Sequence, residues 1–183
     1  MFHLVTGGSG SGKSEYAENF LVDIKKNENR REPFIYVATM QPFGEEAYSR
    51  IAKHRNMRKG KGFKTVECYR NLHDLVVDDN KGVLLECMSN LVANECFPEH
   101  RTALDIDAVY RRVIYGVRRL SLQTENLVIV TNEIASDHVF YDYETELYRE
   151  VLGKINCELA RMADLVTEVV YGIPICIKEA NKS

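Results

Sequence analysis

Short uninterrupted apolar runs alternate along the chain with longer segments whose apolar residues recur at helical spacing. An apolar run of four to eight residues that stops at glycine or at polar residues is typical of a buried strand. Such runs occupy residues 2–6, 34–38, 82–86, 127–131, 165–171 and 173–177, and a weaker one spans 64–67. Gly172 and Pro174 mark a turn between the last two runs.

Helices are predicted between these runs. The clearest spans residues 105–120, where the apolar positions follow the i, i+3, i+4, i+7 rule. Other helices are predicted at 13–25, 44–59, 88–96 and 143–163. This alternation predicts one α/β domain over residues 1–183, with a mostly parallel sheet and helices on both faces. Right-handed crossovers would bring the carboxyl ends of the strands to one edge, where ligands bind in such sheets.

Composition narrows the class of protein. The chain has 183 residues and a net charge of −3, so it lacks the overall basic charge typical of nucleic-acid binding. No apolar run reaches the roughly 18 to 20 residues of a membrane helix, and the N-terminus is too short for a signal peptide. None of the five cysteines forms a C-x2-C pair, so we expect reduced thiols in a cytoplasmic protein.

The first apolar run leads directly into Gly7-Gly8-Ser9-Gly10-Ser11-Gly12-Lys13-Ser14, which matches the phosphate-loop pattern G-x-x-x-x-G-K-S. Glycines let backbone N–H groups turn inward around a phosphate, and the helix that follows adds its positive dipole end. Lys13 can reach the β- and γ-phosphates, and the Ser14 hydroxyl can bind Mg²⁺. A flexible turn is the alternative, but a strand before the loop and a helix after it favour a P-loop NTPase-like fold. The loop does not identify the reaction.

A basic segment, residues 50–58, carries His54 at its centre. It is either a solvated helix face or part of a site in which the cations bind triphosphate. Nearby cations also favour the neutral imidazole, the form able to attack phosphorus. The other histidines, His3, His73, His100 and His138, are predicted to be structural or solvated.

Glu86 ends an apolar run beside the phosphate loop. Its carboxylate could serve Mg²⁺ directly or through water. Alternatively it could cap the helix predicted at 88–96. The sequence pattern alone leaves both roles open.

Further motifs occur in a fixed order along the chain. They are Leu4-Val5-Thr6-Gly7-Gly8, Tyr36-Val37-Ala38-Thr39, Arg50-Ile51-x-x-His54-Arg55-x-x-Arg58, Thr65-x-Glu67-Cys68, Leu84-Leu85-Glu86-Cys87 with Asn94, Val130-Thr131-Asn132-Glu133, Tyr148-Arg149-x-x-x-Gly153-x-x-Asn156 and Ala163-Asp164. Through these motifs nearly the whole chain resembles the bifunctional adenosylcobinamide kinase / adenosylcobinamide-phosphate guanylyltransferase family of cobalamin biosynthesis. The chain departs from the family pattern at Gly10, Lys59 and Cys157 and in residues 134–142, a segment expected to face substrate.

The resemblance implies a P-loop fold, Mg²⁺, GTP and ATP as substrates, a corrinoid acceptor and a homotrimer with sites between subunits. It implies that His54 takes GMP from GTP as a phosphoramidate and that Lys13 serves the phosphoryl transfer. The implied nucleotide contacts are the phosphate loop, Ala38, Thr39, Met40, Arg55, Asn56, Met57, Arg58, Glu67 and Glu86, and the implied metal ligands are Ser14 and Glu86. Two rival interpretations are a P-loop kinase for another small metabolite and a nucleotide-binding switch module. The second lacks a base-reading motif of the GTPase kind.

Overall fold

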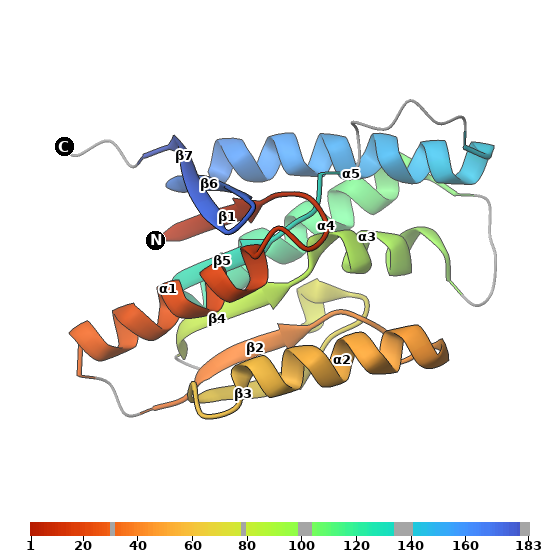
Figure 1. Cartoon of the computed structure of the whole chain (residues 1–183). Coiled ribbons are helices and arrows are strands. Elements are labelled where there is room, and N and C mark those ends of the chain that lie inside the picture. The colour runs from red at the N-terminus through yellow and green to blue at the C-terminus, as the bar shows by residue number, and fades with distance from the viewer. Residues whose placement is uncertain (30–31, 78–79, 99–103, 134–140, 180–183) are drawn as a thin grey trace.

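The computed structural model describes residues 1–29, 32–77, 80–98, 104–133 and 141–179 (Figure 1). The strands are β1 (Phe2–Thr6), β2 (Phe34–Ala38), β3 (Phe63–Glu67), β4 (Asn80–Glu86), β5 (Thr124–Val130), β6 (Leu165–Val170) and β7 (Ile173–Lys178). The helices are α1 (Lys13–Asn27), α2 (Gly44–Arg58), the short 3₁₀ helix η1 (Leu72–Asp74), α3 (Met88–Cys96), α4 (Ile106–Ser121) and α5 (Tyr143–Met162). The predicted strands and helices are therefore confirmed, with ends that differ by a few residues.

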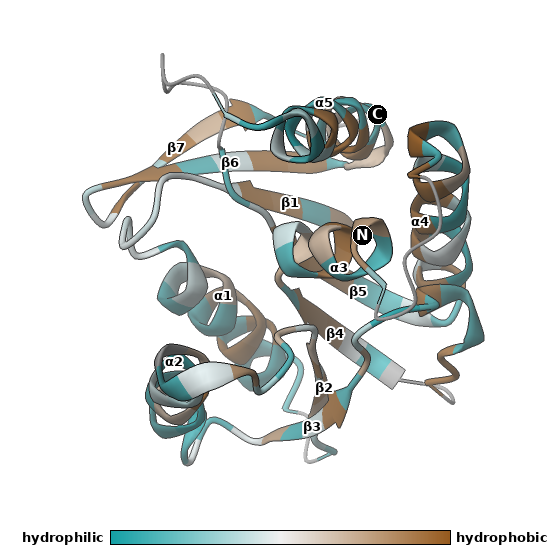
Figure 2. Ribbon diagram, turned by 90° about the vertical axis from the view of Figure 1, so that its right-hand side faces the viewer, coloured by the Kyte–Doolittle hydropathy of each residue, from teal (hydrophilic) through white to brown (hydrophobic). Residues whose placement is uncertain are grey.

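All the strands belong to one sheet in the order β3-β2-β4-β5-β1-β6-β7. Every pairing is parallel except that of β7, which runs antiparallel to β6. Helices α1 and α2 lie on one side of the sheet, and α3, α4 and α5 lie on the other (Figure 2). This confirms the predicted α/β architecture and brings the carboxyl ends of β1, β2, β4 and β5 to one edge.

Two apolar clusters, one on each face, hold these layers together. The larger joins the sheet to α3, α4 and α5 through residues such as Leu85, Leu91, Val117 and Ile155. The smaller joins the sheet to α1 through Ala17 and Leu21. Fully burying an aliphatic side chain contributes about 1.5–3 kcal/mol. None of the described helices is long and apolar enough to cross a bilayer.

Helix α2 is attached to the sheet in a different way. Among its side chains that the structure describes, Arg58 alone is buried, and its guanidinium stacks 3.4 Å above the centre of the Tyr36 ring. Just beyond the helix, Lys61 pairs at 2.8 Å with Glu18 of α1, a carboxylate that is fully buried. The position of α2 therefore depends on polar and cation–π contacts more than on apolar burial.

Two glycines inside helices provide a test of the packing. A Cβ added at Gly116 of α4 would lie 2.9 Å from the Leu72 Cβ and 3.0 Å from the His73 nitrogen, whereas one added at Gly153 of α5 would meet no atom within 4 Å. Gly116→Ala should lower the free energy of unfolding by about 1–3 kcal/mol through overpacking. Gly153→Ala should raise it by about 0.5–1 kcal/mol because alanine favours the helix. Urea denaturation measures both changes. An equal increase in the free energy of unfolding of the two variants would contradict the packing of η1 against α4.

Candidate active site

The phosphate loop connects β1 to α1 and is folded back on itself. Gly12 has a φ of 92°, in the region that favours glycine, and it directly precedes the helix. The Lys13 ammonium is buried and donates to the Gly8 carbonyl at 2.8 Å. Burial lowers the pKa of Lys13, while the neighbouring Cys87 and Glu86 oppose that shift. The turn between β6 and β7 supports the loop, because the Gly172 N–H donates to the Ser11 carbonyl at 2.8 Å.

Glu86, at the end of β4, connects the phosphate loop, the sheet and α2. Its carboxylate accepts hydrogen bonds from the Ser14 hydroxyl and, at 3.1 Å, from the Tyr36 hydroxyl. Burial raises the pKa of Tyr36, so the phenol remains a donor. The N-cap of α3 is Cys87, which makes no side-chain cap bond, so the capping alternative for Glu86 is wrong.

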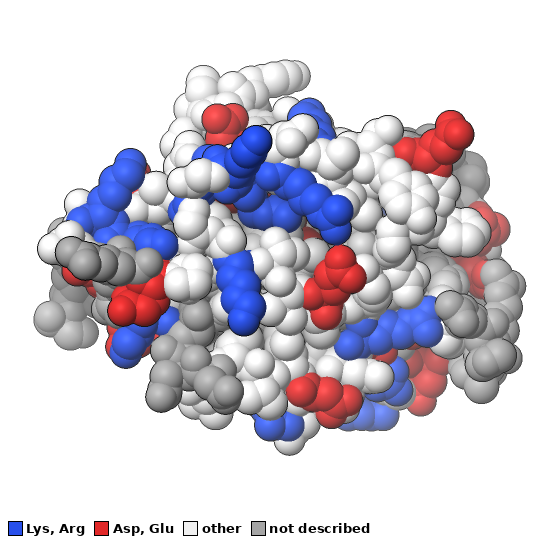
Figure 3. Space-filling model, turned by 90° about the horizontal axis from the view of Figure 1, so that it is seen from below, with Lys and Arg blue, Asp and Glu red and all other residues white. Residues whose placement is uncertain are grey.

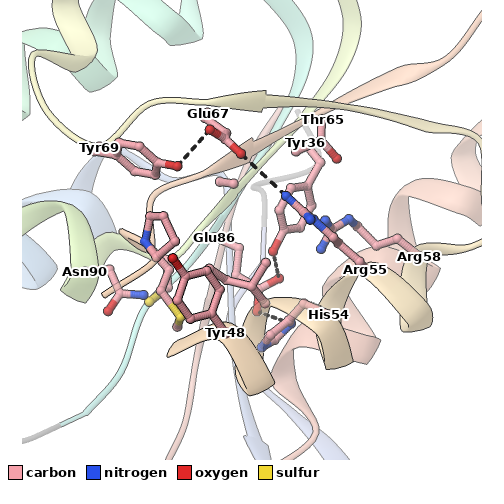
Figure 4. A pocket seen from close by; sticks show the side chains of 15 residues that line it. Tyr36, Tyr48, His54, Arg55, Arg58, Thr65, Glu67, Tyr69, Glu86 and Asn90 are labelled. Atoms are coloured by element: carbon pink, nitrogen blue, oxygen red, sulfur yellow. Dashed lines mark hydrogen bonds and ion pairs between the residues drawn. The ribbon is translucent and has the colours of Figure 1, made fainter. Parts of the chain in front are cut away.

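His54 extends from α2 toward the same carboxylate (Figure 4). Its Nδ1 lies 3.4 Å from Glu86 Oε1 and is buried without a hydrogen-bond partner in the described structure. The two atoms are therefore close, but their geometry does not meet the criteria for a hydrogen bond. The side chain of His54 is 26% exposed, which excludes a fully solvated helix face.

Two clefts meet at His54. The first, which we call the phosphate cleft, has a volume of about 610 Å³ and is lined by the phosphate loop, by cations of α2 and by residues at the ends of β4 and β5. The second, the side cleft, has a volume of about 170 Å³ and is walled largely by apolar and aromatic side chains (Figure 4). His54 and Glu86 line both clefts, so the imidazole lies at their junction.

The structure brings most of the predicted site residues together. The phosphate cleft is lined by Ser9, Gly10, Ser11, Gly12, Lys13, Ser14, Met40, His54, Met57 and Glu86, and the side cleft by Ala38, Met40, His54, Arg55, Arg58, Glu67 and Glu86. Gly7, Gly8, Thr39 and Asn56 line neither. Thr39 is buried and donates from its hydroxyl to the Cys87 carbonyl at 2.8 Å, which fixes the end of β2 to that of β4.

Several residues of the site were not among those predicted. Lys61 and Asn90 line the phosphate cleft, and Tyr36 and Tyr48 line the side cleft. A charged residue in an amphipathic helix ordinarily indicates a solvent-facing position, so lysine and arginine spacing does not reveal which cations turn inward. His3 is buried in β1, and His73 lies on η1, as predicted, whereas His100, His138 and most of the 134–142 segment lie outside the described residues.

One face of the molecule carries a group of basic side chains (Figure 3), although the net charge is −3. The face seen from below, where α2 and β3 are the lowest elements of Figure 1, carries a group of lysine and arginine side chains (Figure 3). Arg50, Lys53 and Lys61 bring positive charge into the phosphate cleft as well. Such a field attracts a triphosphate and strengthens its binding.

The oxygen atoms of Ser14 and Glu86 suit Mg²⁺. A hydroxyl and a carboxylate already in contact at the phosphate loop are hard oxygen ligands of the kind that this ion prefers. Among the described residues no group of three or more His, Cys, Asp or Glu side chains could hold a metal. A site with two protein ligands fits Mg²⁺, which is usually completed by substrate phosphates and water.

Comparison with known proteins finds similar sequences over nearly the whole chain. Residues 3–177 match the family model described as "Cobinamide kinase / cobinamide phosphate guanyltransferase". The chain is 32% identical over 192 residues to the "Bifunctional adenosylcobalamin biosynthesis protein CobU" of Salmonella typhimurium, an alignment covering 97% of this chain and 100% of the relative. It is 31% identical over 189 residues to the protein of the same name from Escherichia coli K12, with the same coverage.

A solved structure of an ATPase domain is similar with a TM-score of 0.52 at 8% identity. The match covers 98% of this chain and 77% of that one. At this identity the likeness concerns the fold alone, and it supports the predicted P-loop class.

Replacing Glu86 separates a role in catalysis from a role in stability. Glu86→Gln keeps the shape of the side chain but removes the charge that Mg²⁺ and the imidazole would meet. We expect metal-dependent turnover to fall about 10–100-fold, with little change in melting temperature. The matched control is Glu95→Gln, another buried carboxylate, which bonds Arg112 and the Asn71 N–H outside both clefts. It should lower the melting temperature and spare turnover, and the opposite pattern would contradict the assignment of Glu86.

Proposed function

The chain belongs to the cobinamide kinase / cobinamide phosphate guanyltransferase family, and on this basis we propose a reaction sequence for its two clefts. The enzyme phosphorylates adenosylcobinamide with a nucleoside triphosphate, ATP or GTP. It then transfers GMP from GTP, through a covalent adduct of His54, to give adenosylcobinamide-GDP. The observation that carries this proposal is the imidazole of His54 at the junction of the two clefts, beside Glu86.

In the kinase step the phosphate cleft holds the triphosphate. The phosphate loop cradles its oxygens, and Lys13 neutralises charge on the transferred group. Mg²⁺, held by Ser14 and Glu86, supplies further neutralisation of the phosphate oxygens when bound. The acceptor oxygen forms a bond to the γ-phosphorus as the bond to the nucleoside diphosphate breaks.

In the guanylyl step His54 acts as the nucleophile. Glu86 faces Nδ1 and favours the tautomer with hydrogen on that atom, which leaves the Nε2 lone pair free. Nε2 attacks the α-phosphorus of GTP, pyrophosphate leaves with the electron pair of the broken bond, and a phosphoramidate forms. A phosphate oxygen of the phosphorylated cobinamide then attacks this phosphorus and displaces the histidine. Covalent catalysis thereby divides one difficult displacement into two easier ones.

The side cleft suits the guanosine part of GTP. Tyr36, Met40 and Tyr48 offer apolar and aromatic surface to a flat base. Glu67 carries a carboxylate at the same cleft, held by the Tyr69 hydroxyl at 2.8 Å and by Arg55 at 3.6 Å. A carboxylate can accept both the ring N–H and the exocyclic amine of guanine, groups that adenine does not present together.

A plain kinase for another small metabolite is the alternative. It accounts for the phosphate cleft with His54 as a binding residue only, but it gives the side cleft no role. The His54→Asn variant distinguishes the two.

We further propose that the enzyme acts in the cytoplasm as a homotrimer. The supporting feature is the edge strand β7 and the turn before it, where Tyr171 is 94% and Ile173 is 64% exposed. Exposed apolar residues on an unpaired edge strand favour association with another chain.

Sedimentation velocity tests this assembly. Ile173→Asp should shift the trimer toward monomer, because a buried, unpaired charge opposes association. The control Leu122→Asp alters an equally apolar residue that is 88% exposed after α4, and it should leave the trimer intact. A fully active wild-type monomer would rule out the trimer.

His54→Asn tests the nucleophile. The variant should form no acid-labile GMP adduct with α-labelled GTP and should lose guanylyl transfer by at least roughly 10³-fold, in line with the loss found when a nucleophile is removed. The kinase step should largely survive, because it needs Lys13 and Mg²⁺ and does not need this imidazole. His73→Asn, which changes a histidine outside both clefts, should retain both reactions. Joint weakening of both reactions in His54→Asn would reduce His54 to a phosphate-binding residue.

A further inference from the structure

The phosphate cleft has two chemically different walls. The wall formed by α2 and the phosphate loop carries the cations Lys13, Arg50, Lys53 and Lys61. A second wall, at the ends of β4 and β5 and the start of α3, is formed by Cys87, Asn90, Val130 and Asn132, and none of these side chains is cationic. A triphosphate belongs on the first wall, so the second faces whatever receives the γ-phosphoryl group.

Asn132 is held on this neutral wall by a fixed set of hydrogen bonds. Its side-chain Nδ2 donates to the Ser89 hydroxyl oxygen at 2.7 Å and lies 4.0 Å from the Cys87 sulfur. Its backbone carbonyl accepts from Asn156 Nδ2 at 3.3 Å, and Asn156 Oδ1 accepts from the Thr131 hydroxyl at 2.7 Å. Asn156 of α5 therefore holds Thr131 and Asn132, the two residues that follow β5, through hydrogen bonds.

The amide atom left over is an acceptor. None of the hydrogen bonds among the described residues uses Asn132 Oδ1, whereas Nδ2 is engaged by Ser89. Lone pairs on an amide oxygen repel phosphate oxygens and accept from a hydroxyl. A hydroxyl donor therefore suits this atom, whereas the oxygens of the triphosphate do not.

We propose that Asn132 binds and orients the alcohol hydroxyl of the phosphoryl acceptor, with Ser89 and Asn156 as positioning residues. The inference rests on the proposed kinase function and assigns its acceptor subsite. Asn132 Oδ1 accepts the hydroxyl hydrogen and so directs an oxygen lone pair toward the γ-phosphorus. The oxygen–phosphorus bond forms, the bond to the leaving diphosphate breaks, and the hydroxyl proton passes to an oxygen of the transferred phosphoryl group and then to water. The amide is no base, and a loose phosphoryl-transfer transition state needs orientation more than proton removal.

The experiment compares Asn132→Ala with the wild type in two reactions of the full-length enzyme. In the kinase reaction, kcat/KM for adenosylcobinamide should fall about tenfold, the value of one hydrogen bond, while KM for the triphosphate stays within about twofold. In the second reaction, formation of the acid-labile GMP adduct from GTP alone should be unchanged, because it needs no acceptor. Asn126→Ala is the matched control, since Asn126 makes a similar bond at 3.0 Å to the Lys81 carbonyl at the opposite end of β5. It should leave both reactions unchanged.

Binding supplies a readout that does not depend on turnover. The measurement is made with a non-hydrolysable ATP analogue present. The wild type should then bind adenosylcobinamide about tenfold more tightly than it binds a corrinoid that lacks the acceptor hydroxyl. Asn132→Ala should lose that preference. If Asn132 had only a structural role, the substitution would weaken the binding of both corrinoids equally.

The possible failures are distinguishable. A variant that keeps full kcat/KM for the corrinoid overturns the inference and leaves the proposed function intact. A variant whose triphosphate KM rises together with loss of the adduct shows that the amide contacts phosphate, which also overturns it. A wild-type protein that neither binds nor phosphorylates adenosylcobinamide overturns the proposed function and this inference together.

Discussion

The burial of one carboxylate, that of Glu86, governs the arrangement of the site. A carboxylate removed from water is unfavourable by several kcal/mol unless donors surround it. Here the donors come from separate parts of the fold, Ser14 from the phosphate loop and Tyr36 from the neighbouring strand, with His54 of α2 close by. Satisfying this group therefore sets the spacing between loop, sheet and helix, which is the spacing that the two clefts require.

Helix α2 is attached to the rest of the domain mainly through polar and charged residues. It has little apolar surface to bury, and it depends on Arg58 stacked over Tyr36 and on the Lys61–Glu18 pair. These two contacts hold α2 against the rest of the domain. The helix can therefore carry the cations that would bind triphosphate without having a large apolar face. On α4, by contrast, Val109, Val113 and Val117 are buried, and the helix carries no residue that lines either cleft.

The fold could be predicted from sequence because its signals are local. Apolar runs such as 2–6 and 34–38 coincide with β1 and β2, and the phosphate loop lies between a strand and a helix as its pattern requires. The site could be predicted only where a motif carried it, as for Lys13 and His54. Glu18 gave no signal, because an acidic residue in a helix is ordinarily solvent-facing, and here its burial is decided by Lys61, more than forty residues away. Asn132 was visible as part of a motif, but its role depends on which amide atom stays free, a property of three-dimensional packing.

The contact between Gly172 and Ser11 has a consequence for biosynthesis. The phosphate loop leaves the ribosome before the turn that supports it, because Ser11 precedes Gly172 in the chain, and β1 pairs only with β5 and β6 among the described strands. At translation rates of about 5–20 residues per second, the loop waits on the order of ten seconds or more for these partners. A nascent chain therefore carries an exposed apolar first strand and an incomplete nucleotide site until nearly the whole domain has emerged. Nucleotide can then act as a ligand that stabilises only the form in which the loop has met these partners.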